Sequence, residues 1–199
     1  SMTKRSKEFG IKQMHADFEF SEVMERIQGV VATVEPHDSI ERYTELGVNV
    51  VTGTAKIISP WEVEVQTADG VQVVSARSIV IAAGARPFVP PIPGLDKIDY
   101  LTSDNVWDLR DKPKRMVVLG GGPIGCELAQ SFNRLGIEVT QVEMAPRLMI
   151  REDEDVSVAV TTNFIKEGID VKLAHTAKEF IIENGEKILL AEHQGKQVR

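Results

Sequence analysis

The sequence predicts an α/β protein, and three patterns along the chain support this fold class. From residue 115 onward, apolar segments of strand length alternate with helical segments, which is the rhythm of a parallel sheet whose strands are joined by helices. A glycine-rich turn connects the first of these strands to its helix. Before residue 110, short β-branched segments flank Asp69-Gly70, a pair typical of tight hairpin turns, so this part is expected to be rich in strands.

The first part of the chain is expected to contain two helices followed by strands. Apolar residues at helical spacing predict a helix from Phe20 to Val34, with Ser21 as its N-cap. A shorter helix is expected over 39–46 and ends at Gly47, because glycine is common just after a helix. Strand character follows in four segments, at 48–52, 55–58, 61–67 and 71–75.

A change in character follows the predicted hairpin. The continuous apolar run 78–82 predicts a buried strand of the parallel type. The proline-rich stretch 86–94 predicts an extended connector, because proline lacks the backbone donor that a central strand requires. A short helix is expected over 102–109, and the charged linker 110–115 is interpreted as the boundary between two domains, residues 1–110 and 111–199.

The second domain is predicted to consist of strand–helix–strand units. The expected strands are 115–119, 138–142 and 170–174, and the expected helices between them are 123–135 and 155–167. Two further strand-like segments, 179–183 and 187–192, flank the turn pair Asn184-Gly185.

Composition limits the classes of function. The chain has 199 residues, of which 42% are hydrophobic and 27% charged, and its formal net charge of −7 argues against nucleic acid as a partner. No apolar run reaches the roughly 20 residues of a membrane span, and no signal peptide opens the chain, so a cytoplasmic protein without a membrane segment is expected. Ser1-Met2 is interpreted as a tag remnant followed by an initiator methionine.

The cysteine and histidine content predicts no metal site. Cys126 is the single cysteine, which excludes a CxxC metal site or a two-thiol redox centre within this chain. The thiol is interpreted as a small core residue rather than a reactive group, since free cysteine is commonly buried. The histidines are too scattered in sequence to suggest a metal site; they are His15, His37, His175 and His193.

Gly120, Gly122 and Gly125 form a GxGxxG pattern between an apolar strand and a helix. Gly120 allows a tight turn, Gly122 lets a pyrophosphate approach the backbone because it has no Cβ, and Gly125 lets the helix pack closely on the strand. Free N–H groups and the positive end of the helix dipole hold the anion. Pro123 fits the first helical turn. The pattern predicts a Rossmann-like NAD(P)-binding domain; the alternative is a tight turn without a ligand.

Glu143 ends the next predicted strand, 18 positions after Gly125. A carboxylate at this place can accept hydrogen bonds from the adenosine ribose hydroxyls and repels a 2′-phosphate, which favours NAD(H) over NADP(H). Arg147 and Arg151 lie nearby in the sequence and weaken that preference.

Three motifs in order carry a resemblance to a known family. They are VVLGGGPIGCELAQSFNRLGIEVTQVE at 117–143, SIVIAAGARPFVPPIPG at 78–94 and VVTGTAKI at 50–57. Together they resemble the FAD-dependent pyridine nucleotide–disulfide oxidoreductases, and most of all the mercuric-reductase-like and dihydrolipoamide-dehydrogenase-like members. The resemblance implies a partial Rossmann-like NAD-binding domain together with a β-rich remnant of a Rossmann-type FAD domain.

The family plan also implies parts that this sequence lacks. A first GxGxxG for FAD, a CxxxxC redox pair with a lysine shortly after it, and a C-terminal interface domain with catalytic His and Glu are not present in the chain. The final strand of the NAD domain is also expected to be missing. We therefore expect a fragment of a homodimeric flavoprotein that passes hydride from NAD(P)H through FAD to an acceptor. Mercuric ion, lipoamide and other disulfides remain open as that acceptor.

The resemblance assigns residues to both cofactors. Those expected at NAD are Gly120, Gly121, Gly122, Pro123, Ile124, Gly125, Cys126, Glu127, Glu143 and Ala177. Those expected at FAD are Ala55, Ala83, Gly84 and Ala85, where Ala83 replaces a common threonine. Pro123 stands where some relatives carry a gating tyrosine.

No residue of this chain is expected to be catalytic. Glu127 matches a glutamate that pairs with the lysine after the redox cysteines on the flavin side; its other interpretation is a favourable helix-dipole partner.

The fragment itself is expected to bind NAD(H) weakly, to hold no stable FAD and to turn over nothing. The competing hypothesis is a non-catalytic module that senses NAD(H) or acts in assembly. Uncovered sheet edges and apolar faces would favour self-association of the chain.

Overall fold

The computed structural model describes residues 6–199, so the interpretation of Ser1-Met2 lies outside the described residues. The chain divides into two compact units. One comprises residues 26–86, and the other comprises the residues up to Glu25 together with 87–199. The predicted domain boundary at 110–111 stays a prediction.

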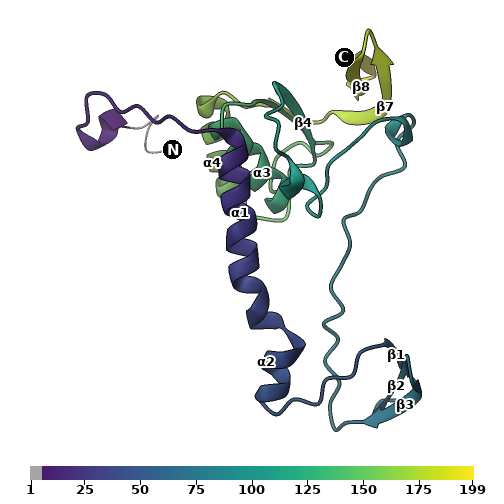
Figure 1. Ribbon diagram of the computed structural model, residues 1–199. Coiled ribbons are helices and arrows are strands. Elements are labelled where there is room, and N and C mark those ends of the chain that lie inside the picture. The colour runs from purple at the N-terminus through teal and green to yellow at the C-terminus, as the bar shows by residue number, and fades with distance from the viewer. Residues whose placement is uncertain (1–5) are drawn as a thin grey trace. The chain divides into compact units, whose positions relative to one another are not determined.

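A parallel three-stranded sheet forms the centre of the larger unit. Its strands are β4 (Arg115–Leu119), β5 (Glu138–Val142) and β6 (Asp170–Lys172), in the order β4-β5-β6. The connecting helices are α3 (Pro123–Arg134) and α4 (Glu154–Glu167), both visible in Figure 1. The predicted strand–helix–strand units, and with them the α/β fold class, are confirmed.

The core of the larger unit lies where the helices face the sheet. Ala129 and Phe132 of α3, Val139 of β5 and Phe164 of α4 are all buried. The first helix, α1 (Phe20–Val34), contributes its first turns to this core. The ring centroids of Phe20 and Phe132 lie 6.4 Å apart. This packing holds α3, and therefore the turn that precedes it, at a fixed place against the sheet.

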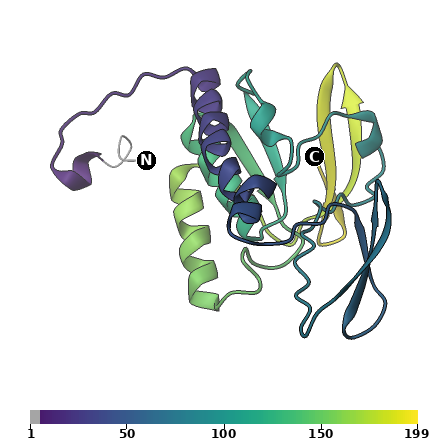
Figure 2. The same ribbon diagram turned by 60° about the horizontal axis from the view of Figure 1, so that its bottom comes forward.

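An antiparallel sheet ends the chain. Its strands are β7 (Thr176–Glu183), β8 (Glu186–His193) and β9 (Lys196–Val198). Asn184 and Gly185 turn the β7–β8 hairpin with φ of 52° and 79°, as their sequence predicts. β9 was not expected from the sequence. Figure 2 shows the yellow β7–β8 hairpin standing clear of the light green α4.

The smaller unit contains most of α1, the helix α2 (Ile40–Glu45) and a second antiparallel sheet. The Ser39 hydroxyl caps α2 by accepting the Arg42 N–H at 3.2 Å. The strands are β1 (Thr54–Ile57), β2 (Glu62–Thr67) and β3 (Gly70–Ser75), paired in that order. Gly70, with φ of 130°, follows Asp69 at the hairpin as expected.

Several expectations about the first part of the chain are wrong. Helix α1 begins at Phe20, so Ser21 lies inside the first turn and is not the N-cap. Residues 48–52 form no strand in the described chain. Over 102–109 a single 3-10 turn, Val106–Asp108, replaces the expected helix, because the Asn105 side chain accepts the Thr102 N–H at 2.6 Å and closes a local turn instead.

The expected buried strand at 78–82 is also wrong. This segment pairs with no strand among the described residues, and Val80 and Ile81 are 87% and 75% exposed. A parallel strand forms only where a neighbouring strand accepts its backbone hydrogen bonds. The apolar composition of the run is therefore compatible with a strand, but this chain supplies no partner for it.

Two short 3-10 helices, Ser6–Phe9 and Glu35–Asp38, flank α1, and a third, Leu95–Lys97, follows the proline-rich connector. Within the described residues, no helix has the length and apolar character that a membrane crossing needs.

Candidate functional site

The glycine-rich turn follows β4 and leads directly into α3. Gly120 has φ of +102°, a backbone conformation that favours glycine, and its N–H donates to the Val142 carbonyl at 2.8 Å. Gly122 is the N-cap residue of α3 with an extended backbone, and Pro123 is the first helical residue. The turn therefore has the tight geometry that the sequence predicts for it.

The glycines after Gly120 differ in what surrounds them. A Cβ at Gly125 would lie 2.5 Å from the Gly120 carbonyl oxygen, so only glycine lets the helix approach the end of β4 this closely. A Cβ at Gly121 would lie 2.6 Å from Leu148 Cδ2 and 3.0 Å from Glu143 Oε2. A Cβ at Gly122 would meet nothing within 4 Å. Neighbouring atoms thus leave no room for a side chain at Gly121 or Gly125, whereas the space beside Gly122 is open.

The open side of the turn coincides with the N-terminus of α3. The N–H groups of Ile124 and Gly125 stand in the first helical turn, where no earlier helical carbonyl is available to them. The first helical N–H that is paired is that of Cys126, which donates to the Gly122 carbonyl at 2.9 Å. Unpaired N–H groups and the helix dipole give this end of α3 a partial positive charge, which suits an anion.

Glu143 follows β5 and brings a carboxylate to the edge of the turn. Its Oε2 accepts the Gly121 N–H at 2.5 Å, and its Oε1 accepts the Ala145 N–H at 2.6 Å. Two backbone donors therefore hold a half-buried negative charge in one place beside the glycines. The sequence placed Glu143 at this turn from its spacing alone.

Arg147 does not face that carboxylate. Its two Nη atoms donate to the Glu152 and Ile150 carbonyls at 3.0 Å and 3.2 Å, so the guanidinium closes the loop between β5 and α4. The weakening of NAD preference that the sequence suggests for Arg147 and Arg151 stays a prediction.

The thiol of Cys126 lies beneath the turn. Its side chain is buried, and Sγ donates to the Gly121 carbonyl at 3.4 Å. Burial raises the pKa of the Cys126 thiol, a hydrogen bond from Gln141 opposes this, and the negative charges of Glu143 and Glu127 raise the pKa further. The neutral thiol that results fits the interpretation of Cys126 as a core residue.

Gln141 is a residue of the site that the sequence analysis missed. It is fully buried on β5, and its Nε2 donates to the Gly120 carbonyl at 3.0 Å and lies 3.5 Å from Cys126 Sγ. A signal for it exists, because strand alternation places Val139, Gln141 and Glu143 on one face of β5. Gln141 is a single amide at a core position, two residues before a carboxylate that is predicted to bind a ligand. Such a residue indicates a polar contact with the turn.

The remaining residues expected at NAD lie at several places in the larger unit. Ile124 and Glu127 are exposed on the first turns of α3. Ala177 lies near the start of β7, where it pairs with Ala191. Their assignment to a cofactor stays a prediction.

The residues expected at FAD precede residue 87 and belong to the smaller unit. Ala55 lies on β1 opposite Val65. Ala83, Gly84 and Ala85 lie in an irregular segment in which Gly84 has φ of 69°. Their role at a flavin also stays a prediction.

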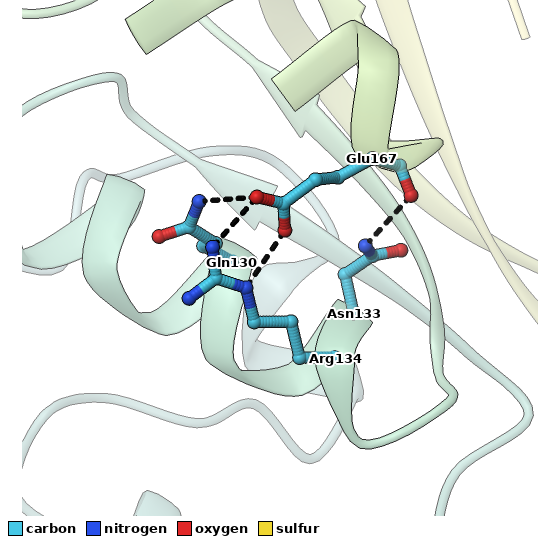
Figure 3. A network of polar contacts seen from close by, with 4 residues as sticks. All are labelled: Gln130, Asn133, Arg134 and Glu167. Carbon is cyan, nitrogen blue, oxygen red and sulfur yellow. Dashed lines mark hydrogen bonds and ion pairs between the residues drawn. The ribbon is translucent and has the colours of Figure 1, made fainter. Parts of the chain in front are cut away.

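A polar cluster joins the end of α3 to the end of α4 (Figure 3). Arg134 donates through Nε and Nη2 to the two carboxylate oxygens of Glu167 at 2.7 Å and 2.6 Å. Gln130 donates to the same carboxylate, and Asn133 donates to the Glu167 carbonyl. The Arg134 bond holds the pKa of the Glu167 carboxyl below its usual value, and the same bond raises the pKa of Arg134. This cluster fixes the helix that carries the glycine turn.

Two histidines that are distant in sequence come together. The rings of His175 and His193 stack with centroids 4.2 Å apart, and each Nδ1 lies within hydrogen-bond distance of a backbone carbonyl, Leu173 and Ala174 respectively. Across the described residues, no three His, Cys, Asp or Glu side chains are grouped so that they could hold a metal ion.

A comparison with protein families decides to which family this arrangement belongs. A family model described as pyridine nucleotide-disulphide oxidoreductase matches residues 9–199. The chain belongs to this family. The resemblance read from the three sequence motifs is thereby confirmed for this oxidoreductase chain.

Curated relatives of this chain include mercuric reductases and a dihydrolipoyl dehydrogenase. The mercuric reductase of Streptomyces lividans is 39% identical over 154 residues, covering 75% of this chain and 32% of the relative. The mercuric reductase of Staphylococcus aureus is 31% identical over 162 residues, covering 81% and 29%. The dihydrolipoyl dehydrogenase of Bacillus subtilis (strain 168) is 33% identical over 147 residues, covering 70% and 32%. The chain thus spans 29–32% of the length of these relatives.

Solved structures agree with the fold. The HOCl-induced flavoprotein disulfide reductase RclA from Escherichia coli matches with a TM-score of 0.66 at 25% identity, covering 91% of this chain and 41% of that one. LpdA from Mycobacterium tuberculosis matches with a TM-score of 0.74 at 21% identity, covering 98% and 43%, which supports the fold alone.

Proposed function

We propose that this chain provides the NAD(P)H-binding part of a flavin-dependent oxidoreductase of its family. The observation that carries the proposal is the glycine turn, which is closed by packing at Gly121 and Gly125 but open at Gly122, at the N-terminus of α3. Membership of the family adds support, because its members use FAD and NAD(P)H. The whole protein would reduce a disulfide or a metal ion.

The residues of the turn suit a dinucleotide pyrophosphate. Without a side chain at Gly122, the phosphates can lie directly against the backbone, and the N–H groups at the start of α3 would donate to them. The Glu143 carboxylate would accept hydrogen bonds from the adenosine ribose hydroxyls. It would use the lone pairs that are not occupied by the Gly121 and Ala145 N–H groups. When bound, the nicotinamide ring supplies the hydride. This chain binds and orients the coenzyme.

The same carboxylate favours NADH over NADPH in this proposal. Two backbone N–H groups hold Glu143 in place, so it cannot easily turn away from a 2′-phosphate. In the following loop, the Arg147 guanidinium donates to the Ile150 and Glu152 carbonyls. Like charges would therefore disfavour the phosphorylated coenzyme.

The flavin is proposed to be held mainly by parts of the parent protein other than this chain. The residues assigned to it, Ala55 and Ala83–Ala85, offer backbone groups and small side chains but no charged or hydroxyl contact. We therefore expect the 199-residue chain alone to purify without a stoichiometric flavin. A bound flavin would be detected by its visible absorbance.

A single methyl group tests the dinucleotide proposal. In Gly122→Ala the new Cβ meets no atom of the free chain within 4 Å, so the fold should be retained, but the methyl group would occupy the path of the pyrophosphate. We expect NADH binding, measured by calorimetric titration, to weaken by about tenfold or more, the equivalent of one lost charge-assisted contact. Gly29→Ala on α1 is the matched control, since its Cβ also meets nothing within 4 Å. Equal NADH affinity in Gly122→Ala and the unmodified chain contradicts the proposal.

A further inference from the structure

We infer that Gln141 is a positioning residue for the glycine turn, which it holds through the Gly120 carbonyl in the conformation that binds a dinucleotide. The inference rests on the proposed function, since it concerns the same turn. Its basis is the contact of a fully buried amide with two groups of the turn, the Gly120 carbonyl at 3.0 Å and Cys126 Sγ at 3.5 Å.

The amide of Gln141 is an unfavourable choice for packing alone. Its exposed fraction is 0%, and its Oε1 has no hydrogen-bond partner among the described residues. Leaving a buried acceptor unpaired costs free energy that an apolar side chain of similar size would avoid. The neighbouring position on the same strand face, Val139, is apolar. The amide at 141 is therefore explained by what its Nε2 does for the turn rather than by the stability of the core.

The contact also fixes which end of the amide faces the turn. If the side-chain amide of Gln141 were rotated by half a turn, its oxygen would face the Gly120 carbonyl oxygen at 3.0 Å, and two acceptors would repel each other. The nitrogen must face inward. The orphaned Oε1 is the consequence of that orientation.

Holding the Gly120 carbonyl sets the direction of the next N–H group. In a planar trans peptide, the carbonyl of one residue and the N–H of the following residue point in opposite directions, and the chain contains no cis peptide bond among its described residues. With the Gly120 oxygen drawn to Gln141, the Gly121 N–H points the other way, to the Glu143 carboxylate at 2.5 Å. Gln141 and Glu143 therefore hold the two ends of one peptide plane.

The next peptide plane is held in the same manner. The Gly121 carbonyl accepts the Met149 N–H at 2.7 Å and the Cys126 thiol at 3.4 Å, so the Gly122 N–H is directed away from these groups. Cys126 in turn packs against Gln141. Gln141 thus holds the first plane through the Gly120 carbonyl and contacts Cys126, one of the two groups that hold the second. Its loss should let the turn rotate before any ligand arrives.

Gln141→Met separates positioning from packing. Methionine has nearly the same length and volume but no N–H donor, and it also removes the orphaned oxygen, so the free energy of unfolding should be unchanged or higher. We expect the affinity of the full 199-residue chain for NADH to fall by about tenfold, which is the effect of one net hydrogen bond. Gln141→Leu is a second apolar variant that repeats the measurement with a different side-chain shape.

The matched control and a spectroscopic readout complete the test. Gln72→Met replaces an exposed glutamine of β3, in the smaller unit, and should leave NADH affinity unchanged. The Gly121 amide proton, held by a carboxylate at 2.5 Å, should resonate far downfield in the NMR spectrum of the unliganded chain. We expect this shift to move upfield in Gln141→Met and to stay in Gln72→Met.

Two results would overturn the inference. One is unchanged NADH affinity in both apolar variants, and the other is an unchanged Gly121 shift in Gln141→Met, which would reduce Gln141 to a packing residue. If the unmodified chain binds neither NADH nor NADPH, the proposed function fails instead. The Gly121 shift, which needs no ligand, then still decides whether Gln141 positions the turn.

Discussion

Glu143 combines two tasks that usually fall to different residues. Its carboxylate fastens the glycine turn through the Gly121 N–H, and it also fastens the start of the following loop through the Ala145 N–H. Both bonds are charge-assisted and short. A negative charge that is held on two sides cannot move away when a ligand brings another negative charge. In the proposed function, the bonds that order the turn would therefore also favour a coenzyme without a 2′-phosphate.

Removing this charge while keeping its shape tests coenzyme choice. In Glu143→Gln the side chain still reaches Gly121 but no longer repels a 2′-phosphate. We expect the ratio of the NADPH and NADH dissociation constants, from parallel titrations, to fall by about tenfold, or about 1.4 kcal/mol. Glu138→Gln, an exposed glutamate at the other end of β5, is the control and should leave the ratio unchanged. An unchanged ratio in Glu143→Gln would mean that this carboxylate does not face the ribose.

At the scale of single residues, the sequence indicated the groups that have a fixed spacing pattern. Gly120, Gly122, Gly125 and Glu143 were found because strand–turn–helix geometry requires them at set intervals. Gln141 was not found, because a lone polar residue within a strand looks like an exposed position until the neighbouring helix is known to cover it. Its partner is a backbone carbonyl, which carries no signal in the amino-acid sequence.

At the scale of elements, the ends of α3 and α4 are joined by the ion pair of Arg134 and Glu167. The side chains of Arg134 and Glu167 are 35% and 21% exposed, so solvent screens part of the interaction. Because the glycine turn lies at the other end of α3, this pair contributes to holding in place the helix that carries the proposed binding site. Its electrostatic origin makes its contribution dependent on pH.

Glu167→Gln should reveal that dependence. The pKa of the Glu167 carboxyl is lowered in the folded chain, so the stabilisation is fully present above the unfolded value of about 4.3 and is lost as pH falls through the lower folded value. We expect the variant to be destabilised by about 1 kcal/mol at pH 7, after allowance for screening, and to approach the unmodified chain near pH 3. Urea unfolding at both pH values measures this.

The control for that measurement is a more exposed ion pair. Glu186→Gln breaks a contact with Arg115 in which both side chains are 62% exposed, and it should change the free energy of unfolding little at either pH. A loss of stability in Glu167→Gln that is the same at pH 7 and pH 3 would show that shape rather than charge makes the α3–α4 contact.

Elements were predictable where the chain itself provides their partners. The strands and helices between 115 and 172 were expected correctly, since β4, β5 and β6 pair with one another and α3 and α4 cover them. The run 78–82 has an equally strong strand composition and forms none. The spacing of apolar residues shows whether a segment is compatible with a strand. The strand forms only if a neighbouring strand accepts its backbone hydrogen bonds.

At the scale of the whole molecule, the lack of a strand that pairs with 78–82 leaves apolar side chains exposed. Val80 and Ile81 are 87% and 75% exposed, in a segment that joins no sheet among the described residues. The match covers 29% and 32% of two mercuric reductases, so in these relatives further chain is available to pair with such a segment. In the 199-residue chain, a second copy is the available partner, and an unpaired apolar edge is a template for it.

We therefore expect the 199-residue chain to self-associate in a concentration-dependent way, and Val80→Lys to reduce this association strongly. A lysine in an edge segment opposes pairing, because a second copy would have to bury its charge. Val158→Lys on α4 is the control, since Val158 is also exposed, at 59%, but lies on a helix whose backbone is already paired. Sedimentation velocity over a hundredfold range of concentration should show a rising mean mass for the unmodified chain and for Val158→Lys, and a constant mass for Val80→Lys. A monodisperse monomer for the unmodified chain over the whole range would contradict the expectation, and an equal loss of association in both variants would mean that added charge, rather than the exposed segment, controls it.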